Sequence, residues 1–376
     1  MASDKGPSTP KHDAVVLYSP GKVVPDHEAV VHRDIAMRIA DLMDVPYDGY
    51  YDEARHAGKH CYFIPSDTIL TPAQRDRLGI RGEQDIFGGY ANHAFMPTKA
   101  ISHGLVRENA GHPQGWSAEF SKQVADATLH GYTAFSFDDV HIGAQRLLAE
   151  GPLRLKPVHA TAGRGQVLLR DEKGLDAALE GLDTTLLGEC GVVLETHLEN
   201  VTTYSVGQVR LPHLTASYIG TQRLTRDNRG EWVYGGSRLR FCRGNYDVLL
   251  GLPLGEGLRA AITMAQRYDA AADACYPGFF ASRRNYDVAG GTDIRGRPAM
   301  GVLEQSWRIG GASRAEIAAL EVLSADPSCH CLWAETLEIF NVDEVAPAHA
   351  VETYAGQDPE LGPIRKYVMV EAYGNK

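Results

Sequence analysis

The chain has 376 residues, with 48 Asp and Glu against 37 Lys and Arg, and a formal net charge of -11. With 44% hydrophobic residues, it is long enough for a large core and for about two to three domains. The acidic balance disfavours nucleic acid or an anionic membrane as a partner, because both attract a positive surface. An anionic ligand would therefore need a local basic pocket.

No apolar stretch approaches the roughly 20 residues that a transmembrane helix needs, and residues 1–12 lack the apolar run of a secretory signal. These features predict a cytoplasmic protein. The cysteines are scattered along the chain rather than arranged as a dense framework. We therefore expect all of them to be reduced thiols: Cys61, Cys190, Cys242, Cys275, Cys329 and Cys331.

The first elements alternate between strand and helix. Apolar runs predict the strands, helical spacing of apolar residues predicts the first helix, and Thr71 with Pro72 opens the second. The expected elements are strands at 14–18 and 60–64, a helix at 28–43 and a short helix from 71. The alternation indicates an open α/β layer over about residues 13–115, followed by a Gly- and Pro-containing boundary.

The central part, residues 116–311, mixes helices and strands. Its expected helices lie at 117–130, 139–150, 173–181 and 255–275, and its expected strands at 153–158, 167–170, 191–195, 203–211, 216–224, 231–241, 281–288 and 299–308. The turn-rich segment 290–296 predicts a hairpin between the last two strands. Residues 312–376 are expected to be an appended element that caps the active site or makes a homodimer contact.

Lys156 lies on a short apolar strand that runs into a loop of small residues at 160–166. Glycines allow the loop N–H groups to point at phosphate oxygens, and the lysine adds a compact charge, so the combination suits a polyphosphate. The loop matches neither the Walker sequence nor the dinucleotide fingerprint. A snorkelling edge lysine before an ordinary turn accounts for the pattern equally well.

Asp287 and Glu304 lie in the two strands of the predicted hairpin. A hairpin can bring them side by side, and period-two alternation places Glu304, Ser306 and Arg308 on one face. Adjacent carboxylates repel each other unless a cation lies between them, and Mg²⁺ takes carboxylates together with substrate phosphates. The alternative is a surface ion pair between Glu304 and Arg308.

The order of these parts resembles the ATP-grasp superfamily, the ATP-dependent carboxylate–amine and carboxylate–thiol ligases that include D-alanine–D-alanine ligases and biotin carboxylases. The resemblance covers about residues 116–311, and it extends to an uncharacterised bacterial ATP-grasp-like family. It implies an α/β (α+β) fold in which two lobes grip ATP, behind an N-terminal α/β domain. The small lobe would span about 120–190 and the large lobe about 191–311.

The same resemblance implies a set of site residues. The cofactor-binding residues would be Lys122, Lys156, Thr161, Gly163, Arg164, Gly165, Gln166, Glu195, Thr196, Leu198 and Glu199. Mg²⁺ or Mn²⁺ would be held by Asp287, Glu304 and Ser306, and the catalytic residues would be Arg284, Arg308 and Gly310. For both arginines a structural salt bridge is an equal alternative, and Ser313 reads as a helix N-cap with Glu316 at the capping-box position.

The resemblance implies an ATP- and Mg-dependent ligase. In such an enzyme a small-molecule carboxylate attacks the γ-phosphate of ATP to give an acyl phosphate and ADP. An amine or other nucleophile then displaces phosphate. Two alternatives stay open. One is an ATP-grasp small-molecule kinase. The other is a non-catalytic ATP-binding regulatory protein, because Ser306 stands where the family usually has Asn and the ribose-binding acid is missing.

Overall fold

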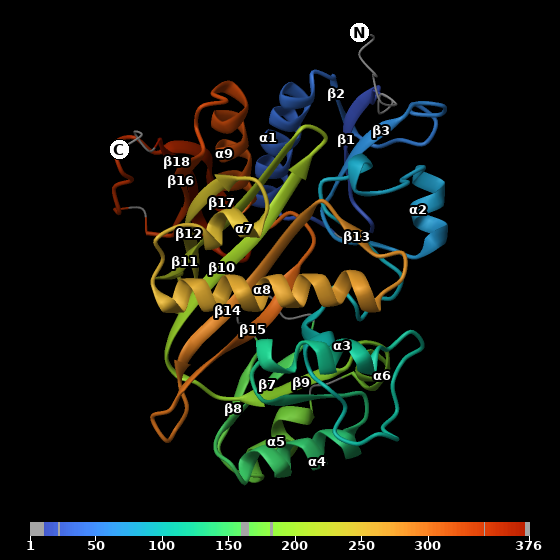
Figure 1. The fold of residues 1–376 in the computed structure, drawn as a ribbon, viewed down its shortest axis with the longest axis vertical. Coiled ribbons are helices and arrows are strands. Elements are labelled where there is room, and N and C mark those ends of the chain that lie inside the picture. Colours follow the sequence, from blue (N-terminus) through green and yellow to red (C-terminus); the bar gives the residue numbers. More distant parts are fainter. Residues whose placement is uncertain (1–10, 22, 159–164, 181–182, 342, 373–376) are drawn as a thin grey trace.

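The computed structural model describes residues 11–21, 23–158, 165–180, 183–341 and 343–372. The predicted loop residues Thr161, Gly163 and Arg164 lie outside this description. The fold is mixed α/β, as predicted from the sequence. Figure 1 shows an elongated molecule with a small sheet and its helices at one end, a large twisted sheet in the middle, and the first strands at the other end.

The N-terminal part is a three-stranded parallel sheet in the order β2-β1-β3. Its strands are β1 (Ala14–Tyr18), β2 (Tyr47–Tyr50) and β3 (Cys61–Pro65), and α1 (Asp26–Met43) follows β1. Ile35, Ala36 and Ile39 of α1 are buried in one core cluster with Val15 and Leu17, which confirms the predicted helical face.

Short elements connect this sheet to the rest of the chain. They are β4 (Ile69–Leu70), α2 (Pro72–Leu78), η1 (Glu83–Asp85), β5 (Gly89–Ala91) and η2 (Lys99–Ser102), where η denotes a 3-10 helix. Thr71 caps α2, as predicted, because its side chain accepts a hydrogen bond from the Gln74 N–H. β13 (Phe280–Ala281) pairs with β5, so a distant segment joins this region.

The small sheet is antiparallel and has the order β6-β9-β7-β8. Its elements are α3 (Ala118–Gln123), η3 (Ala125–Ala127), β6 (Gly131–Ala134), α4 (Phe137–Leu148), β7 (Leu153–Pro157), β8 (Val167–Leu169), α5 (Lys173–Leu179), α6 (Thr184–Cys190) and β9 (Val192–Thr196). The helix expected over 117–130 is wrong in its second half. The chain leaves the helix after Gln123 because Thr128 pairs with Val302 of the large sheet.

The large sheet has eight strands in the order β15-β14-β10-β11-β12-β16-β18-β17. These are β10 (Glu199–Leu211), β11 (Leu214–Arg226), β12 (Trp232–Arg243), β14 (Arg283–Thr292), β15 (Pro298–Ser306), β16 (Cys331–Ile339), β17 (Val351–Asp358) and β18 (Gly362–Ala372). The segment expected as an appended element thus supplies three strands of this sheet. Because these strands share the sheet, we propose that they belong to the large lobe rather than to a separate C-terminal segment.

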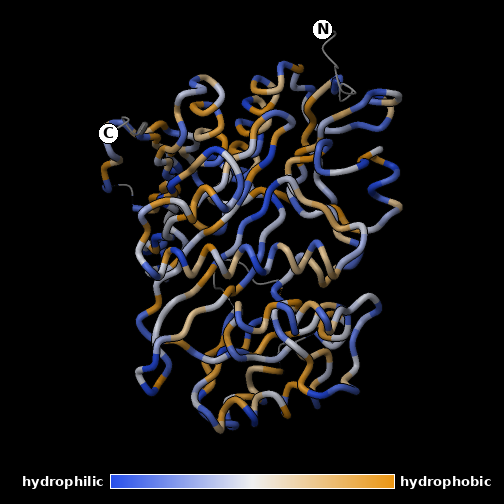
Figure 2. The backbone as a smooth tube through the Cα atoms, in the orientation of Figure 1, coloured by the Kyte–Doolittle hydropathy of each residue, from blue (hydrophilic) through white to orange (hydrophobic). Residues whose placement is uncertain are grey.

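Helices cover both faces of the large sheet. α7 (Tyr246–Leu250) and α8 (Glu256–Cys275) pack on one face, and Figure 1 shows α8 crossing β10 and β14. α9 (Ser313–Ala325) and α1 pack on the other face. The predicted hairpin β14–β15 projects beyond these helices, and its tip at 293–297 is hydrophilic (Figure 2). Of the helices in the described residues, none has the length and hydrophobicity that crossing a membrane requires.

The expectation of six reduced thiols is wrong for one pair. Cys242 and Cys331 form a disulfide, although 89 positions separate them in the sequence. They lie directly opposite each other because β12 pairs with β16 in antiparallel register, which the sequence alone did not reveal. The other cysteines are free: Cys61, Cys190, Cys275 and Cys329.

A buried ion pair joins α9 to the large sheet. Arg283 and Glu316 have side chains exposed by only 2% and 0%, and Arg283 Nη2 lies 2.7 Å from Glu316 Oε1. Glu316 therefore points into the core rather than serving the predicted capping box. Ala312 is the N-cap of α9 and makes no side-chain cap, while the Ser313 hydroxyl accepts a hydrogen bond from the Gly310 N–H.

Replacing Glu316 by Gln should strongly destabilise the protein. Glutamine keeps the shape but leaves the Arg283 charge buried without a counter-ion, which costs about 3–5 kcal/mol. The midpoint of urea unfolding measures the effect. Asp126→Asn is the matched control, because Asp126 pairs with Arg267 in an exposed ion pair, and it should change the midpoint little. Equal shifts in both variants would contradict the role assigned to the buried pair.

Candidate functional site

Two of the three predicted metal ligands lie next to each other. Asp287 in β14 is directly opposite Glu304 in β15. Lys99 Nζ is 2.9 Å from Glu304 Oε2, and the Asn285 amide donates a 3.0 Å hydrogen bond to Asp287. Glu304 thus pairs with Lys99, so the alternative of an ion pair with Arg308 is wrong.

The environment of Asp287 favours a further positive charge. Burial, followed by the neighbouring Glu304 carboxylate, raises the pKa of Asp287 from 3.8 to about 6. Two facing carboxylates form an all-oxygen donor set, the type that suits a hard divalent cation such as Mg²⁺. The chemistry of these residues therefore fits the ion that the sequence resemblance implies.

The short helix η2 lies between the large and the small sheet. Gln305 of β15 donates 2.7 Å hydrogen bonds to the carbonyl oxygens of Met96 and Thr98, just before η2. On the other side, Thr133 of β6 donates a 2.6 Å hydrogen bond to the carbonyl oxygen of Ala100. Both sheets thus fix the backbone that carries Lys99.

A second buried cluster lies on the small-sheet side of η2. Lys156 of β7 forms an ion pair with Glu195 of β9, and both residues are buried. His103, directly after η2, lies 3.3 Å from the other carboxylate oxygen of Glu195. Burial alone would raise the pKa of Glu195, but Lys156 and His103 outweigh it and lower the pKa to about 2. Since β7 is an inner strand, the alternative of a snorkelling edge lysine is wrong.

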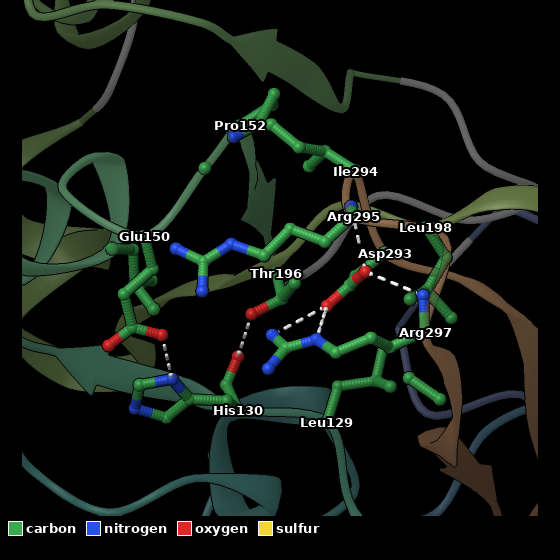
Figure 3. Close-up of a pocket in the computed structure, with 13 residues that line it drawn as sticks. Leu129, His130, Glu150, Pro152, Thr196, Leu198, Asp293, Ile294, Arg295 and Arg297 are labelled. Atoms are coloured by element: carbon green, nitrogen blue, oxygen red, sulfur yellow. Dashed lines mark hydrogen bonds and ion pairs between the residues drawn. The ribbon is translucent and has the colours of Figure 1, made fainter.

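A pocket of about 170 Å³ lies where β9 passes into β10. Two of the predicted cofactor-binding residues, Thr196 and Leu198, line it together with residues of the β14–β15 hairpin tip. In Figure 3, Thr196 lies close to His130, whose carbonyl oxygen accepts a 3.1 Å hydrogen bond from the Thr196 hydroxyl. Glu199, at the start of β10, is exposed and is not among the lining residues.

Two predicted loop residues are described. Gly165 is exposed and has a φ of +68°, a left-handed conformation that favours glycine. Gln166 is half-buried and directly precedes β8. Both therefore lie at the entry to β8, beside the strand that carries Lys156.

Several predicted residues make other contacts. Arg284 pairs with Asp269 and Asp273 of α8 at 2.6 and 3.0 Å, on the face opposite the acid pair, so a structural salt bridge accounts for it. Arg308 Nε lies 3.7 Å from Asp67. Lys122 is exposed on α3.

Two further backbone and hydroxyl groups are also engaged. The Ser306 hydroxyl accepts a 3.2 Å hydrogen bond from Arg283 Nη1. The N–H of Gly310, one of the expected catalytic residues, donates a 3.0 Å hydrogen bond to the Ser313 hydroxyl. Both groups therefore have a hydrogen-bond partner within the protein.

The sequence analysis missed Lys99, His103 and Asn285. Thr98 is a helix-capping residue, because its side chain accepts a hydrogen bond from the Ala100 N–H, and it could have marked the start of η2. The helix that follows has only four residues. Such a short helix shows no hydrophobic periodicity. Asn285 was visible two positions before Asp287, and the alternation of a strand places both on one face.

Replacing Asp287 by Asn should stabilise the metal-free protein at pH 8. The folded state holds the Asp287 proton more tightly than the unfolded chain, so this group favours folding below pH 3.8 and the benefit is lost as the pH rises through about 6. The pKa shift corresponds to up to about 3 kcal/mol. Melting curves at pH 4 and pH 8 in EDTA measure it.

The advantage of the Asn variant should shrink toward pH 4, and excess Mg²⁺ should raise the melting temperature of the wild type more than that of the variant. Asp126→Asn is the control for removing an exposed carboxylate. A variant that is less stable than the wild type at pH 8 without Mg²⁺ would contradict the raised pKa.

The solved structures that match this fold have little sequence identity with the chain. N5-carboxyaminoimidazole synthetase from Staphylococcus aureus is 14% identical, with a TM-score of 0.46 over 96% of this chain and 94% of that one. Phosphoribosylamine–glycine ligase from Thermotoga maritima is 14% identical, with a TM-score of 0.45 over 96% and 92%. D-Alanine–D-alanine ligase from Bacillus anthracis, solved in complex with ATP, is 14% identical, with a TM-score of 0.41 over 85% and 100%.

Likeness at this distance identifies no activity. No curated protein matches the sequence significantly. A family model matches residues 15–368, and the chain therefore belongs to the family described as "Protein of unknown function (DUF3182)".

Proposed function

We propose that this protein is an ATP- and Mg-dependent ligase that activates a small-molecule carboxylate as an acyl phosphate for attack by an amine or another nucleophile. The observation that carries the proposal is the facing pair Asp287 and Glu304, with the buried Lys99 at its edge. A second lysine, Lys156, lies in an ion pair on the small-sheet side of the same short helix.

In this proposal each residue has a defined task. Asp287 and Glu304 would hold Mg²⁺, which neutralises the repulsion that raises the Asp287 pKa. Lys99 and Lys156 would bind phosphate oxygens, and Thr196 and Leu198 would line the adenine pocket. ATP, when bound, would supply the phosphoryl group that activates the substrate carboxylate.

The lysine–glutamate pairs explain how this site would accept a charged nucleotide. In the described structure Lys99 is paired with Glu304, and Lys156 with Glu195. A phosphate group can replace each glutamate as the partner of its lysine, and the released Glu304 can then bind the cation. At Lys99 the exchange leaves no charge without a partner, which would otherwise be costly, whereas Glu195 keeps only His103 beside it.

Two features favour the non-catalytic alternative, in which the protein binds ATP in a regulatory role. The Lys156–Glu195 pair is fully buried and is further fixed by His103. Breaking this pair costs free energy that substrate binding has to supply. Arg284 and the Gly310 N–H, two of the expected catalytic groups, are also engaged elsewhere.

Mg-ATP should raise the melting temperature of the wild type, and Lys99→Gln should abolish most of this shift. A ligand at about 100 times its dissociation constant stabilises the folded state by about 2.7 kcal/mol, which corresponds to several degrees here. Each shift is taken relative to the ligand-free melt of the same variant. The matched control is Lys122→Gln, which removes an exposed lysine and should leave the shift unchanged.

If Lys122→Gln abolishes the shift and Lys99→Gln does not, the phosphate-binding role belongs to Lys122 and its assignment to Lys99 is wrong. If the wild type shows no shift with Mg-ATP, the nucleotide site itself is absent and the ligase proposal falls.

Turnover distinguishes the remaining candidates. The ligase should release ADP and phosphate only when both a carboxylate and an acceptor amine are present, because the acyl phosphate must be consumed. A panel of small carboxylates and amines, followed by phosphate release and mass spectrometry, measures this. A stable phosphorylated metabolite would indicate the kinase, and formation of AMP would exclude the acyl-phosphate scheme.

A further inference from the structure

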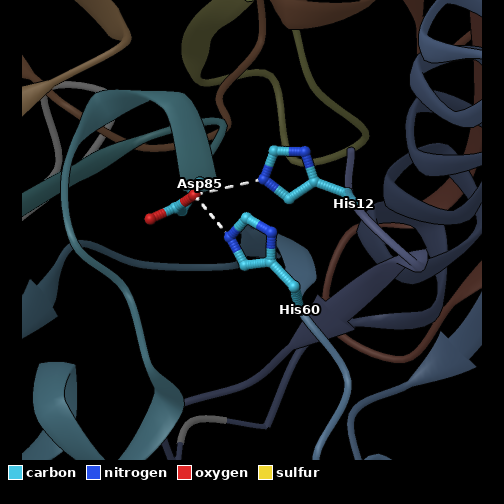
Figure 4. A group of neighbouring side chains, drawn as sticks. All are labelled: His12, His60 and Asp85. Carbon is cyan, nitrogen blue, oxygen red and sulfur yellow. Dashed lines mark hydrogen bonds and ion pairs between the residues drawn. The ribbon is translucent and has the colours of Figure 1, made fainter. Parts of the chain in front are cut away.

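Two histidines and an aspartate lie close together at the N-terminal ends of strands β1 and β3. His12 Nε2 lies 3.1 Å and His60 Nε2 lies 3.0 Å from the same carboxylate oxygen, Oδ1 of Asp85. Figure 4 shows both rings directed at this oxygen from two neighbouring segments. The ligand atoms of the three residues all lie within 4.8 Å of one another.

The backbone holds this arrangement in place. The Asp13 N–H donates to the carbonyl oxygen of His60 at 2.8 Å, and the His60 N–H donates to the Asp13 carboxylate at 2.7 Å. These reciprocal bonds fix the two segments that carry the histidines. The second oxygen of Asp85 accepts a 2.8 Å hydrogen bond from the Arg81 N–H, which directs Oδ1 toward the rings.

We propose that His12, His60 and Asp85 bind a divalent transition-metal ion such as Zn²⁺. Tetrahedral bonds of about 2.1 Å place neighbouring ligand atoms about 3.4 Å apart, so the observed nitrogen–oxygen distances of 3.1 and 3.0 Å would open by a few tenths of an ångström around the ion. The His60 side chain is 23% exposed, whereas His12 and Asp85 are buried. Water can therefore complete the coordination on the His60 side.

This site differs in chemistry from the Asp287–Glu304 pair. Two imidazole nitrogens with one carboxylate select zinc-type ions, whereas an all-oxygen pair selects Mg²⁺. The three ligands come from before β1, from before β3 and from η1, so the ion would join segments that are distant in the sequence. Its expected role is structural, because it stabilises the start of the first sheet, and it does not depend on the proposed ligase activity.

Zinc binding to the tag-free full-length chain tests the proposal. The protein is stripped with EDTA, transferred to excess Mg²⁺ to saturate oxygen sites, equilibrated with Zn²⁺ and gel-filtered, and bound zinc is counted by mass spectrometry. The wild type should retain about one zinc ion per chain. His60→Gln should lose it. His141→Gln is the matched control, since His141 also contacts a carboxylate, Asp176 at 3.1 Å, but the described residues place no second histidine in that contact.

A footprint in the wild type avoids the risk that His60→Gln fails to fold. Diethyl pyrocarbonate acylates accessible imidazoles, and Zn²⁺ should protect His60 but not His141. Wild-type protein that retains no zinc, or equal retention by wild type and His60→Gln, would overturn the proposal. So would acylation of His60 at the same rate with and without zinc, which would mean that the three residues form only a hydrogen-bonded cluster.

Discussion

The centre of the structure depends on ion pairs between carboxylates and basic side chains. A carboxylate removed from water is costly unless a counter-ion and hydrogen bonds replace the lost hydration. Four such pairs connect the elements around the candidate site: Arg283–Glu316, Arg284–Asp269, Lys156–Glu195 and Lys99–Glu304. Asp287 differs, because it faces another carboxylate and an amide. In the proposed function, a bound cation would complete the charge pairing at this point.

Alternation along strand β14 sends neighbouring side chains to opposite faces of the large sheet. Arg283, Asn285 and Asp287 point to the face covered by α9, whereas Arg284 and Tyr286 point to α8. Adjacent residues therefore serve different cores. The hydroxyl of Tyr218 lies 2.7 Å from Glu316 and 2.8 Å from Asn285, so the buried ion pair and the acid pair share one hydrogen-bonded network.

Features that depend on nearby residues were predictable from the sequence. The acid pair was predictable because a single hairpin joins Asp287 and Glu304. The helical and strand spacing of apolar residues predicted most of the helices and strands. Lys99 was missed because its partner lies beyond the whole small lobe in the sequence, and no local pattern marks such a contact. The Cys242–Cys331 pair was missed for the same reason, since it depends on the register between β12 and β16.

That disulfide also has a consequence for the unfolded chain. Crosslinking residues 89 positions apart closes a large loop in the denatured state, and the lost chain entropy amounts to about 4–5 kcal/mol in favour of the folded state. The loop contains Asp287 and Glu304 but neither Lys99 nor Lys156. The thiol–disulfide balance of the surroundings therefore acts on the lobe that carries the carboxylates, while the lysines that approach them belong to chain outside the covalent ring.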